Sequence, residues 1–332
     1  MTRILVYEPL SAGDPGTIAS LGRDSRARQE MVEAGQSMRD AIAGDLAALE
    51  GVELTVAIAR QEASPAGRAP HVRAIAPRPA EEAIAFVERQ APLHDLCWIV
   101  APEAGGLLLR LHDAVGDARW IGCDATAIRL ASSKRATCEA LHAAGIATPL
   151  AFAQAGDGAW IVKPDDGAGT QETRLHATRA AADADMLRRQ GAGAAAVAQP
   201  FVTGEALSIS LVVGPDLARP VAFNRQQVQI DAAGWLHDLG VQAGALQVPD
   251  PRIPALRALA HAVARAIPGL RGYVGIDVVW NERKGAVVIE VNPRVTCAYV
   301  GLSAALQRNL AADILAAHPR DPVREAAGHG GA

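Results

Sequence analysis

The sequence predicts an α/β fold, and three observations lead to this prediction. The 332 residues are half hydrophobic and one-fifth charged, an ordinary globular composition at a length that suggests two or three domains. Short apolar runs at 3–8, 52–58 and 95–101 alternate with helical stretches at 28–49, near 80–90 and from about 105 onward. This alternation implies a parallel sheet with helices on both faces, with 60–80 as a loop. Because no GxGxxG follows the first strand, a dinucleotide-dependent dehydrogenase is disfavoured.

Charge, hydropathy and cysteine content exclude several classes of protein. A net charge of −4 and a pI near 6.1 argue against nucleic acid as a partner. No apolar run reaches the roughly 18 residues of a membrane span, and the first residues lack the apolar core of a signal peptide. The four cysteines are widely spaced, which favours reduced thiols over disulfides or zinc. We therefore expect a cytoplasmic protein with a flexible tail at 318–332.

The segment 130–149 predicts a helix with a lysine in its first turn. Ser132 or Ser133 is a suitable N-cap, and Gly145 ends the helix. Lys134 then lies where the helix dipole disfavours a cation by roughly a few tenths of a kcal/mol. A phosphate bound there would reverse that preference. A solvent-exposed surface lysine explains this segment equally well.

The segment 159–176 predicts a strand that ends in Lys163 and is followed by an acidic, glycine-bearing loop at 165–170. Gly167 and Gly169 allow the backbone to fold over a phosphate chain with its N–H groups pointing inward. Lys163 could supply a positive charge to the same phosphates. The pattern is not GxxxxGK[ST], so a Walker P-loop is excluded, and an ordinary hairpin turn is an equal alternative.

The segment 194–213 predicts two strands separated by a break at Pro200. Two polar residues, Gln199 and Glu205, bracket the apolar pair Phe201 and Val202. A purine pocket combines an apolar wall, backbone groups for the base edge and a carboxylate for the ribose hydroxyls. The segment is therefore a candidate nucleoside site.

The segment 273–294 predicts a hairpin whose two faces differ sharply. If the loop is 282–285, every facing pair sums to 567, and Asp277 lies directly opposite Glu290. Asn292 follows on the same face, opposite Gly275. The other face is then wholly apolar, and its predicted pairs are Ile276 with Val291, Val278 with Ile289, and Trp280 with Val287.

Two facing carboxylates repel each other unless a cation lies between them. The oxygens of Asp277, Glu290 and Asn292 form a hard ligand set that suits Mg²⁺ or Mn²⁺. Arg294 follows at the metal edge, where its N–H donors could hold a phosphate or an oxyanion. A solvent-facing strand with scattered charge is the alternative, which the pairing of two acids in an apolar hairpin disfavours.

These segments, in this order, resemble the ATP-grasp superfamily of carboxylate–amine ligases over roughly 120–310. The resemblance implies an α+β ATP-grasp fold in which a Rossmann-like domain at 1–122 precedes two subdomains at 123–198 and 199–317 that enclose ATP. It assigns Asp277, Glu290 and Asn292 to Mg²⁺, and Arg294 and Lys163 to catalysis. The residues implied to contact ATP are Lys134, Lys163, Asp165, Gly167, Ala168, Gly169, Thr170, Gln199, Pro200, Phe201, Val202 and Glu205.

Within the superfamily, the stretches at 292–302, 223–228 and 28–46 resemble the group that contains tyramine–L-glutamate ligase of methanofuran biosynthesis. This resemblance implies an ADP-forming enzyme that joins glutamate to an aromatic amine through an acyl phosphate, in methanofuran- or methylofuran-type cofactor assembly. Its partners would be a small carboxylate and a small amine, with Arg225 and Arg294 as candidate contacts for the substrate carboxylate. Alternatives are another amino-acid ligase and a catalytically silent nucleotide-binding protein, and a homodimer is left open.

Overall fold

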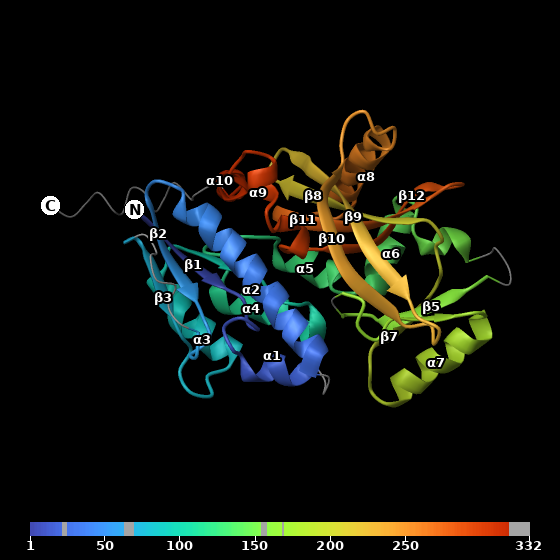
Figure 1. Cartoon of the computed structure of the whole chain (residues 1–332), viewed down its shortest axis with the longest axis horizontal. Coiled ribbons are helices and arrows are strands. Elements are labelled where there is room, and N and C mark those ends of the chain that lie inside the picture. Colours follow the sequence, from blue (N-terminus) through green and yellow to red (C-terminus); the bar gives the residue numbers. More distant parts are fainter. Residues whose placement is uncertain (22–24, 63–69, 154–157, 168, 319–332) are drawn as a thin grey trace.

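The computed structural model describes residues 1–21, 25–62, 70–153, 158–167 and 169–318. It contains three sheets, which confirms the predicted α/β class (Figure 1). Within these residues no helix is both long enough and apolar enough to cross a membrane. Two predictions fall on residues outside this range: Ala168, predicted to contact ATP, and 319–332 of the predicted tail.

The first sheet is parallel, with strand order β3-β2-β1-β4. We call this sheet and its helices the parallel-sheet unit. Its strands are β1 (Thr2–Tyr7), β2 (Val52–Ala57), β3 (Val72–Ile75) and β4 (Leu96–Ile99). Its helices are α1 (Pro15–Ser20), α2 (Ser25–Ala47), α3 (Ala83–Gln90), α4 (Leu107–Val115) and α5 (Ala125–Ala131), with short 3₁₀ turns at Ala91–Leu93 and Ala104–Gly106.

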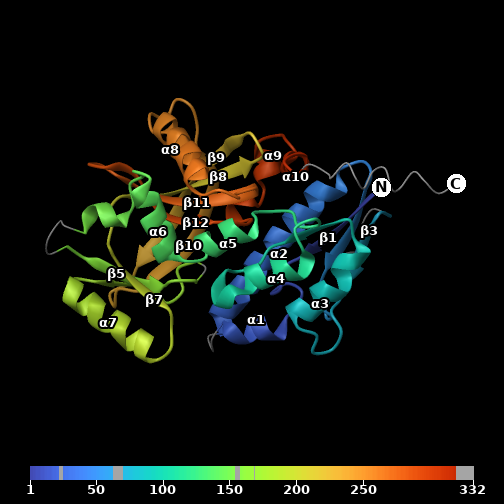
Figure 2. The ribbon, with the colours of Figure 1, turned by 180° about the vertical axis from the view of Figure 1, so that it is seen from behind.

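Alternate residues of β1 pack against different helices, as period-2 strand geometry requires. Ile4 and Val6 share a core cluster with the buried face of α2. Leu5 and Tyr7 share another cluster with α3 and α4. The predicted coverage of both faces is therefore confirmed, and α2 is seen from one side in Figure 1 and α3 and α4 from the other in Figure 2.

The predicted loop at 60–80 is wrong in one part, because β3 lies within it. Val72 pairs in parallel with Leu54 of β2, at the edge of the sheet. An edge strand of four residues has few buried side chains, so its apolar pattern is too weak to mark it in the sequence.

The second sheet is small and antiparallel, with order β6-β5-β7. Its strands are β5 (Trp160–Pro164), β6 (Arg174–His176) and β7 (Ala196–Pro200). Its helices are α6 (Lys134–Ala143) and α7 (Arg179–Gly191), and a 3₁₀ turn covers Pro149–Phe152. The predicted cap of α6 is resolved: the Ser133 hydroxyl accepts the Ala136 N–H, and Gly145 follows the helix with φ +77°.

The third sheet has five antiparallel strands in the order β10-β9-β8-β11-β12. They are β8 (Glu205–Val213), β9 (Ala218–Ile230), β10 (Leu236–Leu246), β11 (Gly272–Asn281) and β12 (Gly285–Asn292). Its helices are α8 (Ile253–Ala266), α9 (Leu302–Ala305) and α10 (Leu310–Ala316), and a 3₁₀ turn covers Cys297–Tyr299. His318, placed in the predicted tail, accepts the Gly122 N–H through Nε2 at 2.9 Å.

The hairpin of β11 and β12 follows the predicted register only at the end that lies far from its turn. Asp277 faces Glu290 and Ile276 faces Val291, as predicted. A β-bulge then shifts the pairing, so Val278 faces Val288 and not Ile289, and Trp280 faces Ala286 and not Val287. The bulge places an extra residue, Ile289, between the two registers. The apolar face still closes, because Val288 is buried where Ile289 was expected.

Candidate functional site

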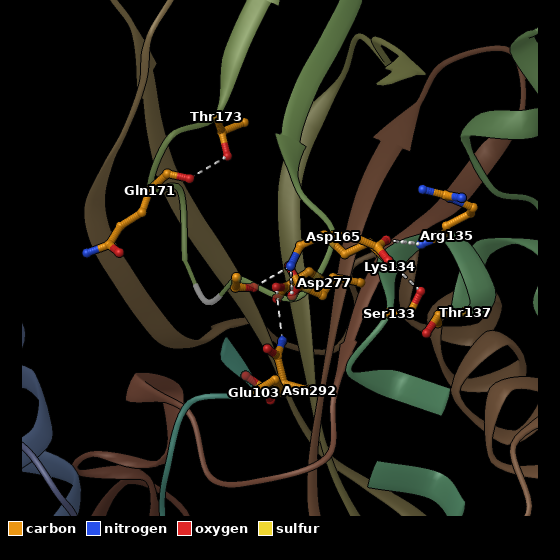
Figure 3. A network of polar contacts seen from close by, with 12 residues as sticks. Glu103, Ser133, Lys134, Arg135, Thr137, Asp165, Gln171, Thr173, Asp277 and Asn292 are labelled. Atoms are coloured by element: carbon orange, nitrogen blue, oxygen red, sulfur yellow. Dashed lines mark hydrogen bonds and ion pairs between the residues drawn. The ribbon is translucent and has the colours of Figure 1, made fainter. Parts of the chain in front are cut away.

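The acid pair on the hairpin is held by two amides. Asp277 on β11 lies opposite Glu290 on β12. Asn292 Nδ2 donates to Asp277 Oδ2 at 3.1 Å, and Gln226 Nε2 of β9 donates to Asp277 Oδ1 at 2.8 Å. Figure 3 shows the side chain of Asn292 pointing toward Asp277 from the neighbouring strand. Each oxygen of Asp277 thus has one neutral donor.

Two buried lysines, Lys134 and Lys163, lie beside this pair. Lys134 Nζ is 3.0 Å from Glu290 Oε1, and the exposed fractions of these side chains are 4% and 14%. Lys163 lies at the end of β5 and is also buried. The pKa of Lys163 is lowered to about 8, because burial and the nearby Lys134 outweigh the opposing effect of the Glu290 carboxylate. The structure therefore concentrates both signs of charge in one place.

The two acids of the hairpin have different partners, since Glu290 pairs with Lys134 whereas Asp277 accepts from neutral amides. Burial and the Glu290 carboxylate together raise the pKa of Asp277 to about 7, against the opposing hydrogen bonds from Asn292 and Gln226. In the described part of the chain, no group of three His, Cys, Asp or Glu side chains is arranged to hold a metal ion, so the hairpin offers two acids and one amide as ligands. An oxygen-only set of this size fits Mg²⁺, which binds through one or two carboxylates and completes its shell with water and phosphate oxygens.

The predicted phosphate loop begins with a residue that has another function in this structure. The Asp165 carboxylate accepts the Ser133 hydroxyl and the Arg135 N–H, both at 2.8 Å, and its carbonyl oxygen accepts the Lys134 N–H. Figure 3 shows these contacts at the start of α6. The anion expected at this helix N-terminus is therefore the protein's own carboxylate, which stabilises the exposed N–H groups.

The rest of this loop is tied to its surroundings on both sides. Gly167 approaches Pro164 so closely that an added Cβ would lie 2.9 Å from the proline Cβ, and Gly169 has φ +67°. Lys134 Nζ donates to the Gly167 carbonyl oxygen. Thr170 Oγ1 accepts the Asp238 N–H of β10 at 3.1 Å. The Lys134 contact ties the loop to α6, and the Thr170 contact ties it to the third sheet.

The candidate nucleoside segment leaves one buried acceptor open. Gln199 on β7 is 3% exposed, and its Oε1 accepts no hydrogen bond from any described residue. Val202 and Pro200 are buried beside it, and the Phe201 N–H donates to the Ala159 carbonyl oxygen at 2.9 Å. A buried amide oxygen without a donor is costly, so it suits a ligand that brings one.

Two residues that were predicted to contact different substrates, Glu205 and Arg225, form an ion pair with each other. Arg225 Nε donates to Glu205 Oε1 at 2.6 Å, and Arg252 donates to Glu205 Oε2. Arg252 also pairs with Asp250 at 2.7 Å. Glu205, predicted for ribose, and Arg225, predicted for a substrate carboxylate, are therefore brought together but are engaged with one another. Both side chains remain partly exposed.

Arg294 follows the end of β12, and its partner was not predicted. Its Nε and Nη2 donate to the two carboxylate oxygens of Glu103 at 3.0 and 2.9 Å. Glu103 follows β4 of the parallel-sheet unit. The one signal in the sequence was an acidic residue just past the end of a buried strand, where ligand sites of parallel sheets are found. Gln226 was missed as well; Asn224 and Gln226 alternate on β9, which marks a polar face.

Known families match most of this chain. A pre ATP-grasp 3 domain family matches residues 53–128, and an ATP-grasp domain family matches residues 131–298. The solved structure of an ATP-grasp superfamily protein from Archaeoglobus fulgidus has a TM-score of 0.64 at 19% identity, and the similarity covers 95% of this chain and 88% of that one. At this identity the likeness bears on the fold.

Two relatives with named activities are also similar to this chain. The tyramine–L-glutamate ligase of Methanocaldococcus jannaschii is 30% identical over 210 residues, which are 63% of this chain and 58% of the relative. That of Methanocaldococcus fervens is 28% identical over 210 residues, or 63% of this chain and 61% of the relative. The similarity thus spans about three-fifths of the relatives' length.

Proposed function

Because its family match covers half of the chain, this protein belongs to the ATP-grasp domain family, and on that premise we propose that it is an ADP-forming carboxylate–amine ligase. The observation that carries this proposal is the meeting of two buried lysines, Lys134 and Lys163, with the Asp277–Glu290–Asn292 oxygen set. Phosphoryl transfer from ATP depends on positioning and on charge neutralisation, and this set supplies both signs of charge for it.

We propose that ATP lies between the second and third sheets, with 1–122, 123–198 and 199–317 as the three domains. Lys134, Lys163 and the 165–170 loop would hold its phosphates. Gln199 Oε1 would accept the exocyclic amino group of adenine, which supports the proposal because that oxygen otherwise lacks a donor. Glu205 would bind the ribose hydroxyls after exchanging an arginine partner.

Asp277, Glu290 and Asn292 would hold Mg²⁺ between them and the phosphates. The ion would neutralise phosphate charge during transfer. The raised pKa of Asp277 supports this placement, because a carboxyl group that ionises reluctantly by itself gains most from a cation.

The proposed reaction has two steps. A substrate carboxylate oxygen attacks the γ-phosphorus of ATP, and the bond to the β–γ bridging oxygen breaks to release ADP. The amine nitrogen then attacks the acyl carbon, loses a proton, and inorganic phosphate leaves as the amide forms. Arg294 would donate to the transferring phosphoryl group and then to the tetrahedral oxyanion. Closure of the 165–170 loop would keep water from the acyl phosphate.

For the substrates, we propose glutamate as the acid and an aromatic amine such as tyramine as the acceptor. The support is the similarity to the two Methanocaldococcus enzymes, whose names give those substrates. A place in the assembly of a methanofuran-type cofactor would follow from that product.

The test is phosphate release from ATP and Mg²⁺ with the purified protein, L-glutamate and a panel of amines that includes tyramine and tyrosine. We expect release that requires glutamate and one aromatic amine, together with a product whose mass equals the two substrates minus water. Release with two amino acids and not with an aromatic amine would replace the substrates and keep the ligase. ATP binding without release across the panel would contradict the ligase and favour a silent nucleotide-binding protein.

A further inference from the structure

The parallel-sheet unit contributes a carboxylate to the proposed active site. Glu103 lies in the turn after β4, and it contacts a residue 191 positions later in the chain. The contact is bidentate, with Arg294 Nε at 3.0 Å from Oε1 and Nη2 at 2.9 Å from Oε2. Such paired hydrogen bonds fix the plane and the direction of the guanidinium group.

This ion pair is enclosed. The exposed fractions of the Arg294 and Glu103 side chains are 11% and 5%. Arg294 Nη1 also donates to the Val295 carbonyl oxygen at 3.2 Å. Among contacts with described residues, three of the five guanidinium N–H groups are thus engaged, and one remains on each terminal nitrogen. The pair therefore leaves the guanidinium oriented and still able to donate twice.

The turn that carries Glu103 also reaches the phosphate loop. The Gly105 N–H donates to Asp166 Oδ2 at 2.9 Å. Gly105 and Gly106 have φ values of +59° and +68°, which glycine adopts at little cost, so the turn can bring both contacts to one edge. A single turn of the parallel-sheet unit thus contacts both the arginine and the loop that would enclose ATP. Glu103 is one of the labelled side chains in Figure 3.

We propose that Glu103 is a positioning residue that aims the free donors of Arg294 at the transferring phosphoryl group, so that this arginine is effective only when the parallel-sheet unit is seated. The proposal rests on the proposed ligase function. Stability alone is a poor reason for the pair, because well-packed apolar residues often replace a buried ion pair without loss. An arginine held this rigidly is what electrostatic stabilisation of a transition state requires.

The experiment compares Glu103→Gln, Arg294→Ala and the double variant. Glu81→Gln is the matched control, because Glu81 makes a similar bidentate pair with Arg89 within the parallel-sheet unit at 2.6 Å. Titration calorimetry measures the affinity of each protein for Mg²⁺–ATP and for Mg²⁺–ADP with aluminium fluoride, a mimic of the transferring phosphoryl group. This readout needs no knowledge of the acid or the amine, so it is independent of the substrate panel.

We expect Glu103→Gln to weaken binding of the fluoride complex about 100-fold, the scale on which misplacement of a catalytic group acts, with ATP affinity changed less than about twofold. In the Arg294→Ala background the same change should have no further effect, and Glu81→Gln should alter neither affinity. Equal losses for both ligands, or additive losses in the double variant, would overturn the positioning role. Failure of the wild type to turn over any substrate pair, with these differences intact, would overturn the ligase alone.

Discussion

Replacement of Asp277 by Asn should stabilise the protein in the absence of metal, and the gain should grow with pH. Asp277 has a pKa of about 7, against an ordinary value of 3.8, because it is buried and faces Glu290. Its ionisation in the folded protein therefore costs about 4 kcal/mol more than in the unfolded chain. A raised carboxyl pKa favours the folded state fully below 3.8, and this advantage is lost as the pH rises to 7.

The Asn variant resembles the protonated acid at every pH, so it escapes this loss. The expected gain in the free energy of unfolding is about 2 kcal/mol at pH 5 and about 4 kcal/mol at pH 8. An unfolding entropy of about 2.1 cal/mol/K per residue gives about 0.7 kcal/mol/K for this chain. The melting temperature should therefore rise by about 3 °C at pH 5 and about 6 °C at pH 8.

Thermal unfolding of both proteins, without metal and over pH 5 to 9, measures this difference. Asp95→Asn is the control of opposite sign, because its Arg3 partner lowers the pKa of Asp95. That variant should be destabilised by the same amount throughout pH 5 to 9, because both the ordinary value of 3.8 and the lowered pKa of Asp95 lie below this range. A pH-independent gain for Asp277→Asn, or a loss at pH 8, would refute the reasoning.

Mg²⁺ and ATP should offset most of this difference in stability at pH 8. With Mg²⁺ and ATP at about 100 times their dissociation constants, the wild type should gain about 2.7 kcal/mol by mass action. Asp277→Asn, which lacks one anionic ligand, should gain much less and show no turnover. Equal stabilisation of both proteins by Mg²⁺ and ATP would contradict the role of Asp277 as a metal ligand.

Three further predictions concern the charge of Lys163, the role of Glu290 and the packing of Trp235. ATP affinity should fall as the pH rises through about 8, because Lys163 loses its charge there, and calorimetry should show this fall in the wild type but not in Lys163→Met. Glu290→Gln should fold normally but reduce kcat by roughly 1,000-fold, since a metal ion supplies several kcal/mol to the transition state; steady-state phosphate release checks this, and near-normal turnover would contradict it. Trp235→Ala should lower stability by about 2 kcal/mol, because Arg174 and Arg189 lie 5.1 and 5.9 Å from its ring centre and its strand end pairs with β6. Denaturant unfolding measures the last effect, and an unchanged midpoint would exclude the packing role of this ring.

Much of the site could be predicted because its chemistry lies in short, local patterns. The buried strands alternate with helices, and one hairpin sets Asp277 opposite Glu290 within a few residues of its own turn. Strands joined by a short turn have few possible registers, and burial of the apolar face selects among them. Capping chemistry likewise located the start of α6, which places Lys134.

Tertiary structure decided everything that depends on contacts between distant segments. The bulge at Ile289 changes the outer register of the hairpin, and β3 forms only because β2 offers it an edge. Asp165 faces the start of α6 across 30 residues, which no local period encodes. Glu103 meets Arg294 across 191 residues. Sequence periodicity indicates which face of an element is buried, but the packing of whole units decides which partner covers that face. The orientation of Arg294 is therefore a property of the assembled fold.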